Sequence, residues 1–255
     1  MSFHAQLLEA FESHDPDAIR EAIAAGANVI DAVKGRPPIV ALAEMYTRSA
    51  RFADCLRALL DAGASFDDPL LEALLLDDDD GLRALLARTP SGRDRRVQFA
   101  CAYTSLEGVT PLHVCAEYNS IRCARVLLDA GHPVDARADT DPQGIGGQTP
   151  LFHTVNSSRN YCRPMMELLV DEGASLDIRL RGLAWGRGFE WETTIIDVTP
   201  LSYAQCGLYS QFHRREEDVF ANVAYLFARR FGVALPRRNV PNRYLRDSRV
   251  FPPRQ

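Results

Sequence analysis

The chain has 255 residues, of which 46% are hydrophobic and 25% charged, and these globular values exclude wholesale disorder. Its net charge of −5 gives no whole-protein reason to expect a nucleic-acid partner. No stretch reaches the ~18 apolar residues that a bilayer-spanning helix needs, and the N-terminus has no signal-peptide pattern, so we expect a cytoplasmic protein with no membrane role.

The six cysteines are spaced without any Cys-x-x-Cys pair, and several fall in apolar, helix-like contexts. Free, buried and reduced thiols are therefore the favoured interpretation, with disulfides as the alternative. The cysteines are Cys55, Cys101, Cys115, Cys123, Cys162 and Cys206.

A short motif recurs in the second half of the chain. Residues 110–113 read Thr-Pro-Leu-His, and residues 127–131 read Leu-Leu-Asp-Ala-Gly. The opening returns at 149–151, with Leu-Leu before Gly173, and again at 199–201. This pattern resembles the ankyrin repeat, in which Thr-Pro opens a first helix and Leu-Leu-x-x-Gly closes a second. The resemblance implies stacked repeats and a binding surface, because one repeat cannot bury its apolar face alone.

Counting back from the residues that close each second helix gives three weaker units in the first half. They start near Ala5, Pro37 and Asp68. The unit at Pro37 reaches its glycine, Gly63, about five residues late, which predicts extra residues between its two helices.

Four consecutive aspartates, residues 77–80, lie between the two helices predicted for the third unit. The favoured interpretation is a helix cap, because negative charge at a helix N-terminus is stabilising by ~0.3–1 kcal/mol. A divalent-metal site is the alternative, but consecutive carboxylates lack the spacing of a calcium loop. We expect no metal and no cofactor.

The predicted fold class is therefore all-α: an ankyrin-repeat solenoid of about six helix pairs, with elongated β-hairpin loops in its C-terminal half. The solenoid is predicted over residues 1–232, with units starting near 5, 37, 68, 110, 149 and 199. Residues 233–255 form a tail rich in arginine and proline, with six arginines against one aspartate.

Three of the linking segments are longer than the ~12 residues of a standard repeat, in which they form hairpins called fingers. The longest, residues 178–196, alternates like two strands around a turn at Gly186 and Gly188. Arg179 and Arg181 are predicted to face Glu190 and Glu192 across it. Residues 96–104 are predicted to pair beside this long finger. Residues 139–148 are predicted to form a flexible glycine-rich tip, since they lack the Gly-Lys-Ser/Thr of a phosphate loop.

Both tryptophans, Trp185 and Trp191, lie in the long finger. They could pack onto the neighbouring finger and stiffen it. At least one could instead be an exposed anchor, because tryptophan, tyrosine and arginine dominate interface hot spots. The sequence leaves both interpretations open, and a mixed outcome as well.

No catalytic motif is present, so we expect a non-catalytic protein–protein interaction module rather than an enzyme. Its partner is expected to be a protein of unknown identity, and the chain itself a monomer. The predicted binding residues come from the concave face and the finger tips: Tyr103, Glu117, Tyr118, Asn156, Ser157, Arg181, Trp185, Arg187, Phe189 and Trp191.

Three alternatives stay open. The chain could be a dedicated inhibitor or immunity-type subunit of one enzyme. It could be an enzyme with an unrecognised site in the fingers, which a pocket with convergent titratable groups would indicate. It could bind nucleic acid through the basic tail, although that tail could equally lie as a strap over Glu216, Glu217 and Asp218.

Overall fold

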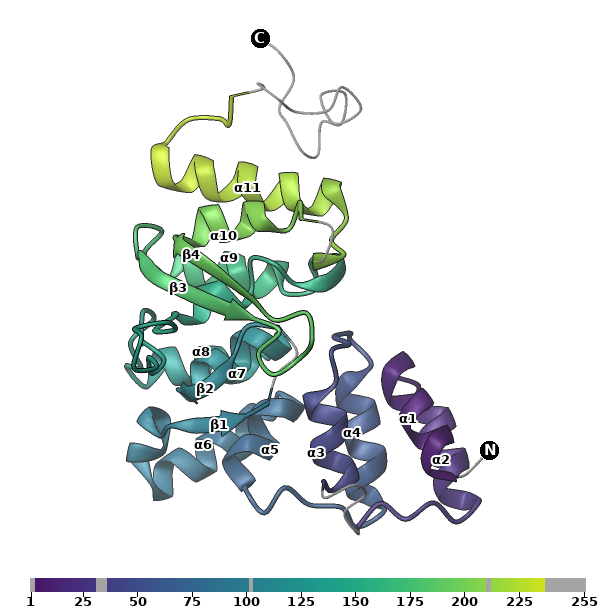
Figure 1. Cartoon of the computed structure of the whole chain (residues 1–255). Helices are drawn as coiled ribbons and strands as arrows, with labels where there is room; N and C mark the ends of the chain where they lie inside the picture. Colours follow the sequence, from purple (N-terminus) through teal and green to yellow (C-terminus); the bar gives the residue numbers. More distant parts are fainter. Residues whose placement is uncertain (1–2, 31–35, 101–102, 210–211, 237–255) are drawn as a thin grey trace.

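The computed structural model describes residues 3–30, 36–100, 103–209 and 212–236. Helix pairs follow one another in chain order, from α1 and α2 at the lower right of Figure 1 to α11 at its top. No helix among these residues is both long and apolar enough to cross a bilayer. Residues 237–255 lie outside the described part, so the predictions for most of the tail are untested.

The first three predicted units each contain two α-helices. Asp15 and Asp68 accept hydrogen bonds from backbone N–H groups in the first turns of α2 and α5, which fixes where those helices begin. A proline follows each of these two caps, where its missing N–H costs nothing. The helices are α1 (Phe3–Ser13), α2 (Pro16–Ala24), α3 (Pro38–Glu44), α4 (Phe52–Asp61), α5 (Pro69–Leu76) and α6 (Asp79–Arg88).

In the second half, the threonines of the repeated motif act as helix caps. Thr110 and Thr199 each form a capping box with the third helical residue, His113 and Ser202 respectively. The helices are α7 (Pro111–Tyr118), α8 (Ile121–Asp129), α9 (Arg163–Asp171), α10 (Pro200–Cys206) and α11 (Glu216–Phe231).

The unit at Thr149 departs from the expected helix pair. Its first helix is reduced to two short 3₁₀ segments, η2 (Pro150–His153) and η3 (Ser158–Asn160). Arg159 and Asn160 have φ values of 50° and 58°, which a right-handed helix cannot accommodate.

The aspartate run joins neighbouring units. Asp78 caps α6 by accepting from the Gly81 N–H at 3.0 Å. Asp77 accepts from the Cys123 N–H at 2.8 Å, in the first turn of α8 in the following unit. The cap interpretation therefore accounts for both residues, with one contact across the repeat boundary.

The fingers contain two antiparallel hairpins: β1 (Val97–Phe99) with β2 (Leu106–Val109), and β3 (Leu180–Trp185) with β4 (Thr193–Val198). A 3₁₀ turn, η1 (Pro90–Asp94), precedes the first hairpin. The predicted pairing of arginines with Glu190 and Glu192 is wrong. Leu180 pairs with Val198, so Arg179 reaches Asp197, and the two glutamates lie in the turn beyond the strands.

The fingers lie side by side, as predicted for residues 96–104. Thr104 forms an isolated antiparallel bridge with Trp185, and the Gly186 N–H donates to the Tyr103 carbonyl at 3.0 Å. The glycine-rich segment joins them, because the Gly146 N–H donates to the Gly182 carbonyl at 2.9 Å. Side chains of both helix pairs and fingers form one continuous hydrophobic core. The described cysteines are buried and free: Cys55, Cys115, Cys123, Cys162 and Cys206.

Candidate functional site

The turn of the long finger, residues 186–192, carries an aromatic cluster that is buried at its base and exposed at its top. Trp185 forms the base with 2% of its surface exposed. Its indole stacks on Phe212 at 4.2 Å between ring centroids and on Tyr103 at 5.7 Å. Contacts from the preceding finger and from the α10–α11 loop thus hold this tryptophan in place.

Trp191 and Phe189 form the top of the cluster. Trp191 is 38% exposed and Phe189 is 43% exposed, and their rings stack at 4.7 Å with an interplanar angle of 20°. The Trp191 ring also lies 4.6 Å from that of Trp185. The outcome is therefore mixed: Trp185 is packed, and Trp191 presents an aromatic surface to solvent.

The base of the cluster contains a buried donor and a cation. The indole N–H of Trp185 is buried and makes no hydrogen bond with any residue that the structure describes, and such orphaned groups are uncommon in proteins. The guanidinium of Arg214 lies 4.7 Å over the Tyr103 ring. Tyr209 continues the aromatic surface beyond Phe212 at 6.2 Å and is itself exposed.

Two residues predicted for the concave surface are instead buried. Glu117 is 4% exposed, and its two carboxylate oxygens contact Arg48 Nε and His153 Nδ1, each at 3.1 Å. Tyr118 lies under the Arg48 guanidinium, and its hydroxyl donates to the Ala43 carbonyl. The physical reason is the long α3–α4 connection, which brings Arg48 against the end of α7 and covers both side chains.

Asn156 is also buried: its side-chain N–H donates to the Tyr203 carbonyl, and its backbone carbonyl accepts from the Arg214 guanidinium. Ser157 is half-buried, and its hydroxyl accepts from the Cys162 N–H at 2.9 Å. Arg214 and Ser157 thus satisfy backbone groups where the fifth unit leaves helical geometry, and Asn156 ties this unit to α10. The predicted accessible concave face therefore loses Glu117, Tyr118 and Asn156.

The two finger arginines remain at the surface. Arg187 pairs with Glu107 on β2 at 2.7 Å, which ties the long finger to the preceding one. Arg181 is exposed, and its side chain lies over Gly144 in the glycine-rich segment. Both residues thus border the fingers rather than the concave face.

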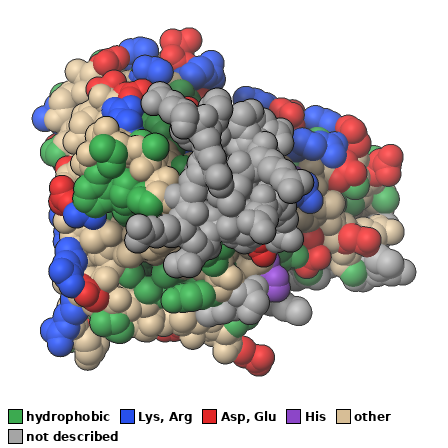
Figure 2. All heavy atoms as spheres, turned by 90° about the horizontal axis from the view of Figure 1, so that it is seen from above, with side chains coloured by type: hydrophobic (Ala, Val, Ile, Leu, Met, Phe, Trp, Pro, Cys, Tyr) green, Lys and Arg blue, Asp and Glu red, His purple; other side chains and the backbone are tan. Residues whose placement is uncertain are grey.

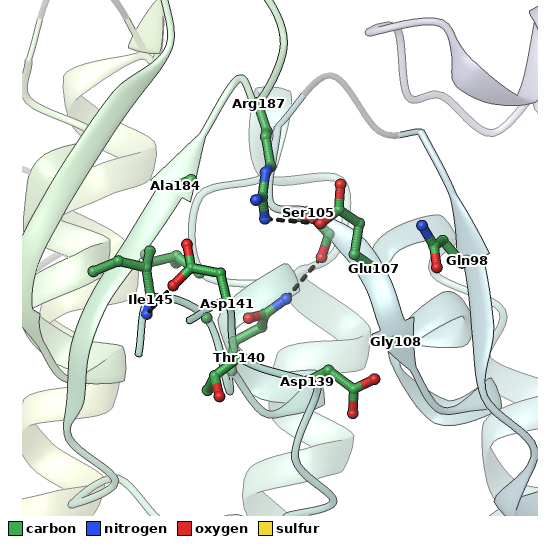
Figure 3. A pocket seen from close by; sticks show the side chains of 13 residues that line it. Gln98, Ser105, Glu107, Gly108, Asp139, Thr140, Asp141, Ile145, Ala184 and Arg187 are labelled. Carbon is green, nitrogen blue, oxygen red and sulfur yellow. Dashed lines mark hydrogen bonds and ion pairs between the residues drawn. The ribbon is translucent and has the colours of Figure 1, made fainter. Parts of the chain in front are cut away.

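A cavity of about 190 Å³ lies between the fingers (Figure 3). Its charged groups are engaged in holding the loops. Arg187 and Glu107 point toward each other across its mouth, and Asp141 accepts from the Gln143 and Ile145 N–H groups, each at 2.9 Å. Asp139 lies 3.8 Å from Arg96. These carboxylates therefore stabilise the loops. Among the described residues, no group of three or more His, Cys, Asp or Glu is arranged to hold a metal.

Buried histidines form part of the packing between units. The His113 ring contacts the Thr110 hydroxyl at 2.9 Å and the Gln148 carbonyl at 3.0 Å, and burial holds its pKa well below the ordinary value. His132 contacts the same hydroxyl at 2.9 Å, and burial likewise lowers its pKa. His113 therefore serves as a neutral tie between adjacent units, a structural role.

The sequence did not single out Arg48, Phe212, Arg214 or Tyr209, which complete these clusters. No local pattern marks them, because each acts through residues far away in the chain.

Seen from the α11 end, the surface carries charged side chains along its margins and hydrophobic side chains in patches between them (Figure 2).

Comparison with known proteins identifies the repeat. The family model described as Ankyrin repeat matches residues 107–139, which span β2, α7 and α8. The human protein named Ankyrin repeat and SOCS box protein 16 is 32% identical to this chain over 126 residues. That region is 45% of this chain and 22% of the human protein, so the chain spans about a fifth of that relative. Residues 107–139 thus match an ankyrin repeat, in agreement with the resemblance that the sequence motif predicted.

Proposed function

We propose that this chain binds a protein partner through the aromatic tip of its long finger, with Phe189 and Trp191 as the principal contacts. Ankyrin repeats generally mediate protein–protein interactions, so the repeat matched at residues 107–139 supports a protein-binding function. The observation that carries the proposal is the stacked, exposed Phe189–Trp191 pair resting on a buried tryptophan.

This pair combines a large apolar area with little remaining freedom. Trp191 stacks on Phe189 and packs against Trp185, so its side chain would lose little conformational entropy when a partner binds. Rigid aromatic side chains of this kind are enriched among the residues that dominate binding energy.

Charged residues share the turn with the pair. Arg187 precedes Phe189 and pairs with Glu107, and Glu190 lies exposed between Phe189 and Trp191 in the sequence. Arg214 borders the base of the cluster over Tyr103. An apolar centre with a charged rim is the usual anatomy of a protein interface.

The proposed function is non-catalytic. The carboxylates around the finger cavity are committed to loop contacts, and the buried Glu117 is committed to Arg48 and His153. Ion pairs of this kind order the fold rather than present a reactive group to a substrate.

The test compares two aromatic-to-alanine variants in affinity capture from the host lysate. Trp191→Ala removes the proposed contact, whereas Phe231→Ala removes a similarly exposed aromatic from the end of α11. We expect one protein to be retained by the wild type and by Phe231→Ala and lost with folded Trp191→Ala. Equal capture by all three would overturn the proposal.

A further inference from the structure

The backbone of β3 reveals which groups of β4 point outward. The Gly182 carbonyl accepts from the Gly146 N–H, so it points away from β4 and toward the glycine-rich segment. Gly182 is paired with Ile196. In antiparallel strands, paired residues alternate between those that exchange hydrogen bonds and those whose N–H and C=O groups both point outward. The Gly182–Ile196 pair is therefore of the second kind.

The same alternation applies along the strand. Gly186, four residues after Gly182, also directs its N–H away from β4, to the Tyr103 carbonyl. Thr194, two residues before Ile196, must then direct its own N–H and C=O outward as well. Two residues of β4 thus offer two donors and two acceptors along its outer edge.

That edge has no neighbour in the part of the chain that the structure describes, where the sheet contains β3 and β4 alone. Thr194 is exposed, and Ile196 is 65% exposed. Natural edge strands are commonly protected by proline, lysine or a bulge. Residues 193–196, Thr-Thr-Ile-Ile, contain neither proline nor lysine and have high strand propensity, and the backbone departs from strand geometry only at Asp197, whose φ is 61°.

The opposite edge of the hairpin already forms backbone hydrogen bonds with other fingers. There, the Gly182 carbonyl of β3 accepts from the Gly146 N–H, and the N–H of Gly186, the residue after β3, donates to the Tyr103 carbonyl. Backbone hydrogen bonds therefore already join neighbouring fingers on the β3 side of this sheet. The outer edge of β4 is the corresponding position on the opposite side.

We propose that the outer edge of β4 binds an extended segment of a protein partner, which adds as a further strand through the backbone of Thr194 and Ile196. The inference rests on the proposed protein-binding function and specifies the conformation of the bound segment. The exposed Ile196 side chain lies near Ile145 over Gly182, so an apolar side chain of the added strand has an apolar surface to contact. Backbone pairing gives affinity in such complexes, and alternate side chains give specificity.

The test begins with a random-peptide phage library selected on the wild-type protein, and the enriched peptide is then labelled for fluorescence anisotropy. Thr194→Pro removes an outward donor and leaves the β3 ladder intact. Thr194→Val keeps that donor. We expect Thr194→Pro to weaken peptide binding about tenfold or more, and Thr194→Val to leave it within about threefold. Equal binding to Thr194→Pro, or no enriched peptide, would overturn the inference.

Amide hydrogen exchange of the wild-type complex gives a readout that does not depend on a variant folding. The bound peptide should slow exchange at Thr194 and Ile196, whereas Ile195, whose N–H faces β3, should change little. Unchanged exchange at both outward amides would contradict strand addition.

The two proposals fail differently. Loss of peptide and partner with Trp191→Ala but not with Thr194→Pro would retain the tip as the binding site and reject the β4 edge. Loss with Thr194→Pro alone would support the edge and reject the tip. A wild-type dimer that Thr194→Pro converts to monomers would mean that β4 pairs with a second copy, which overturns the inference of a separate partner.

Discussion

Trp191 lies against Gly186 so closely that a β-carbon at position 186 would fall 1.8 Å from the Cζ3 atom of the indole. Gly186 also has a φ of 69°, in the left-handed region that favours glycine. The glycine therefore makes the turn and creates the space in which Trp191 stacks. Gly188, with a φ of 83°, has no atom within 4 Å of such a β-carbon.

Gly186→Ala is expected to displace Trp191 and reduce partner binding nearly as much as Trp191→Ala does. Gly188→Ala is the matched control, because it carries a similar left-handed backbone cost of about 1 kcal/mol without meeting the indole. Binding should be measured by calorimetry once the captured partner is purified. Equal binding losses in the two glycine variants would mean that backbone strain, not Trp191, controls the tip.

The two tryptophans should differ in their effect on stability. Trp185→Ala removes a buried indole packed between Phe212 and Tyr103, and it should lower the free energy of unfolding by about 3–5 kcal/mol. Trp191→Ala, at an exposed site, should cost about 1 kcal/mol. Urea denaturation followed by circular dichroism measures both. A stability loss in Trp191→Ala as large as that in Trp185→Ala would contradict the assigned roles.

The buried charge of Glu117 should depend on Arg48. Arg48→Met leaves a buried carboxylate without its guanidinium partner and should destabilise the protein by about 3–5 kcal/mol. The double variant Arg48→Met/Glu117→Leu removes both charges and should be more stable than Arg48→Met alone. Denaturant melts of Arg48→Met, Glu117→Leu and the double variant decide this. If the two single losses add up to the loss of the double variant, the pair is not coupled.

Stability should fall in mild acid through His14. Burial, assisted by the charge of Arg48, lowers the pKa of His14 from its ordinary 6.5 to about 4. Between these two pH values His14 is protonated in the unfolded chain but not in the folded protein. The free energy of unfolding therefore falls as the pH drops from about 6.5 to about 4. The full contribution of this one residue is about 3 kcal/mol.

His14→Asn should lose less stability than the wild type over that pH window, as measured by urea melts at a series of pH values. Asparagine suits the position because the φ of residue 14 is 47°, a conformation that asparagine tolerates. His113 and His132 also have lowered pKa values and should preserve part of the acid sensitivity. Identical pH profiles for the two proteins would exclude His14 as a contributor.

Helix boundaries could be predicted from the sequence because caps are local. Thr110 and Thr199 hydrogen-bond within their own first turns, and Asp15 and Asp68 do the same. Spacing alone also indicated the longer α3–α4 connection, since the extra residues displace Gly63 from its expected place. The sequence wrongly predicted a regular first helix in the fifth unit, because its motif is intact at Thr149 and the irregular backbone begins only after it.

The candidate site was less predictable because distant residues determine which side chains are exposed. Periodicity placed Glu117 on the concave face, but Arg48, 69 positions earlier, covers it. Trp185 and Trp191 look alike in sequence, and Phe212 from a later loop determines that Trp185 is the buried one. The hairpin register likewise differs from the predicted one, because Leu180 pairs with Val198 and Arg179 therefore meets Asp197 in place of the glutamates in the turn.

The most direct test of the central claim is site-specific photo-cross-linking in the native host. The photoreactive phenylalanine analogue p-benzoylphenylalanine replaces Phe189 in one protein and Phe231 in another, two exposed aromatic positions on different elements. A discrete cross-linked protein from position 189 and none from position 231 is the predicted result. The same cross-linked protein from both positions, or none from position 189, would contradict the assignment of the finger tip as the binding site.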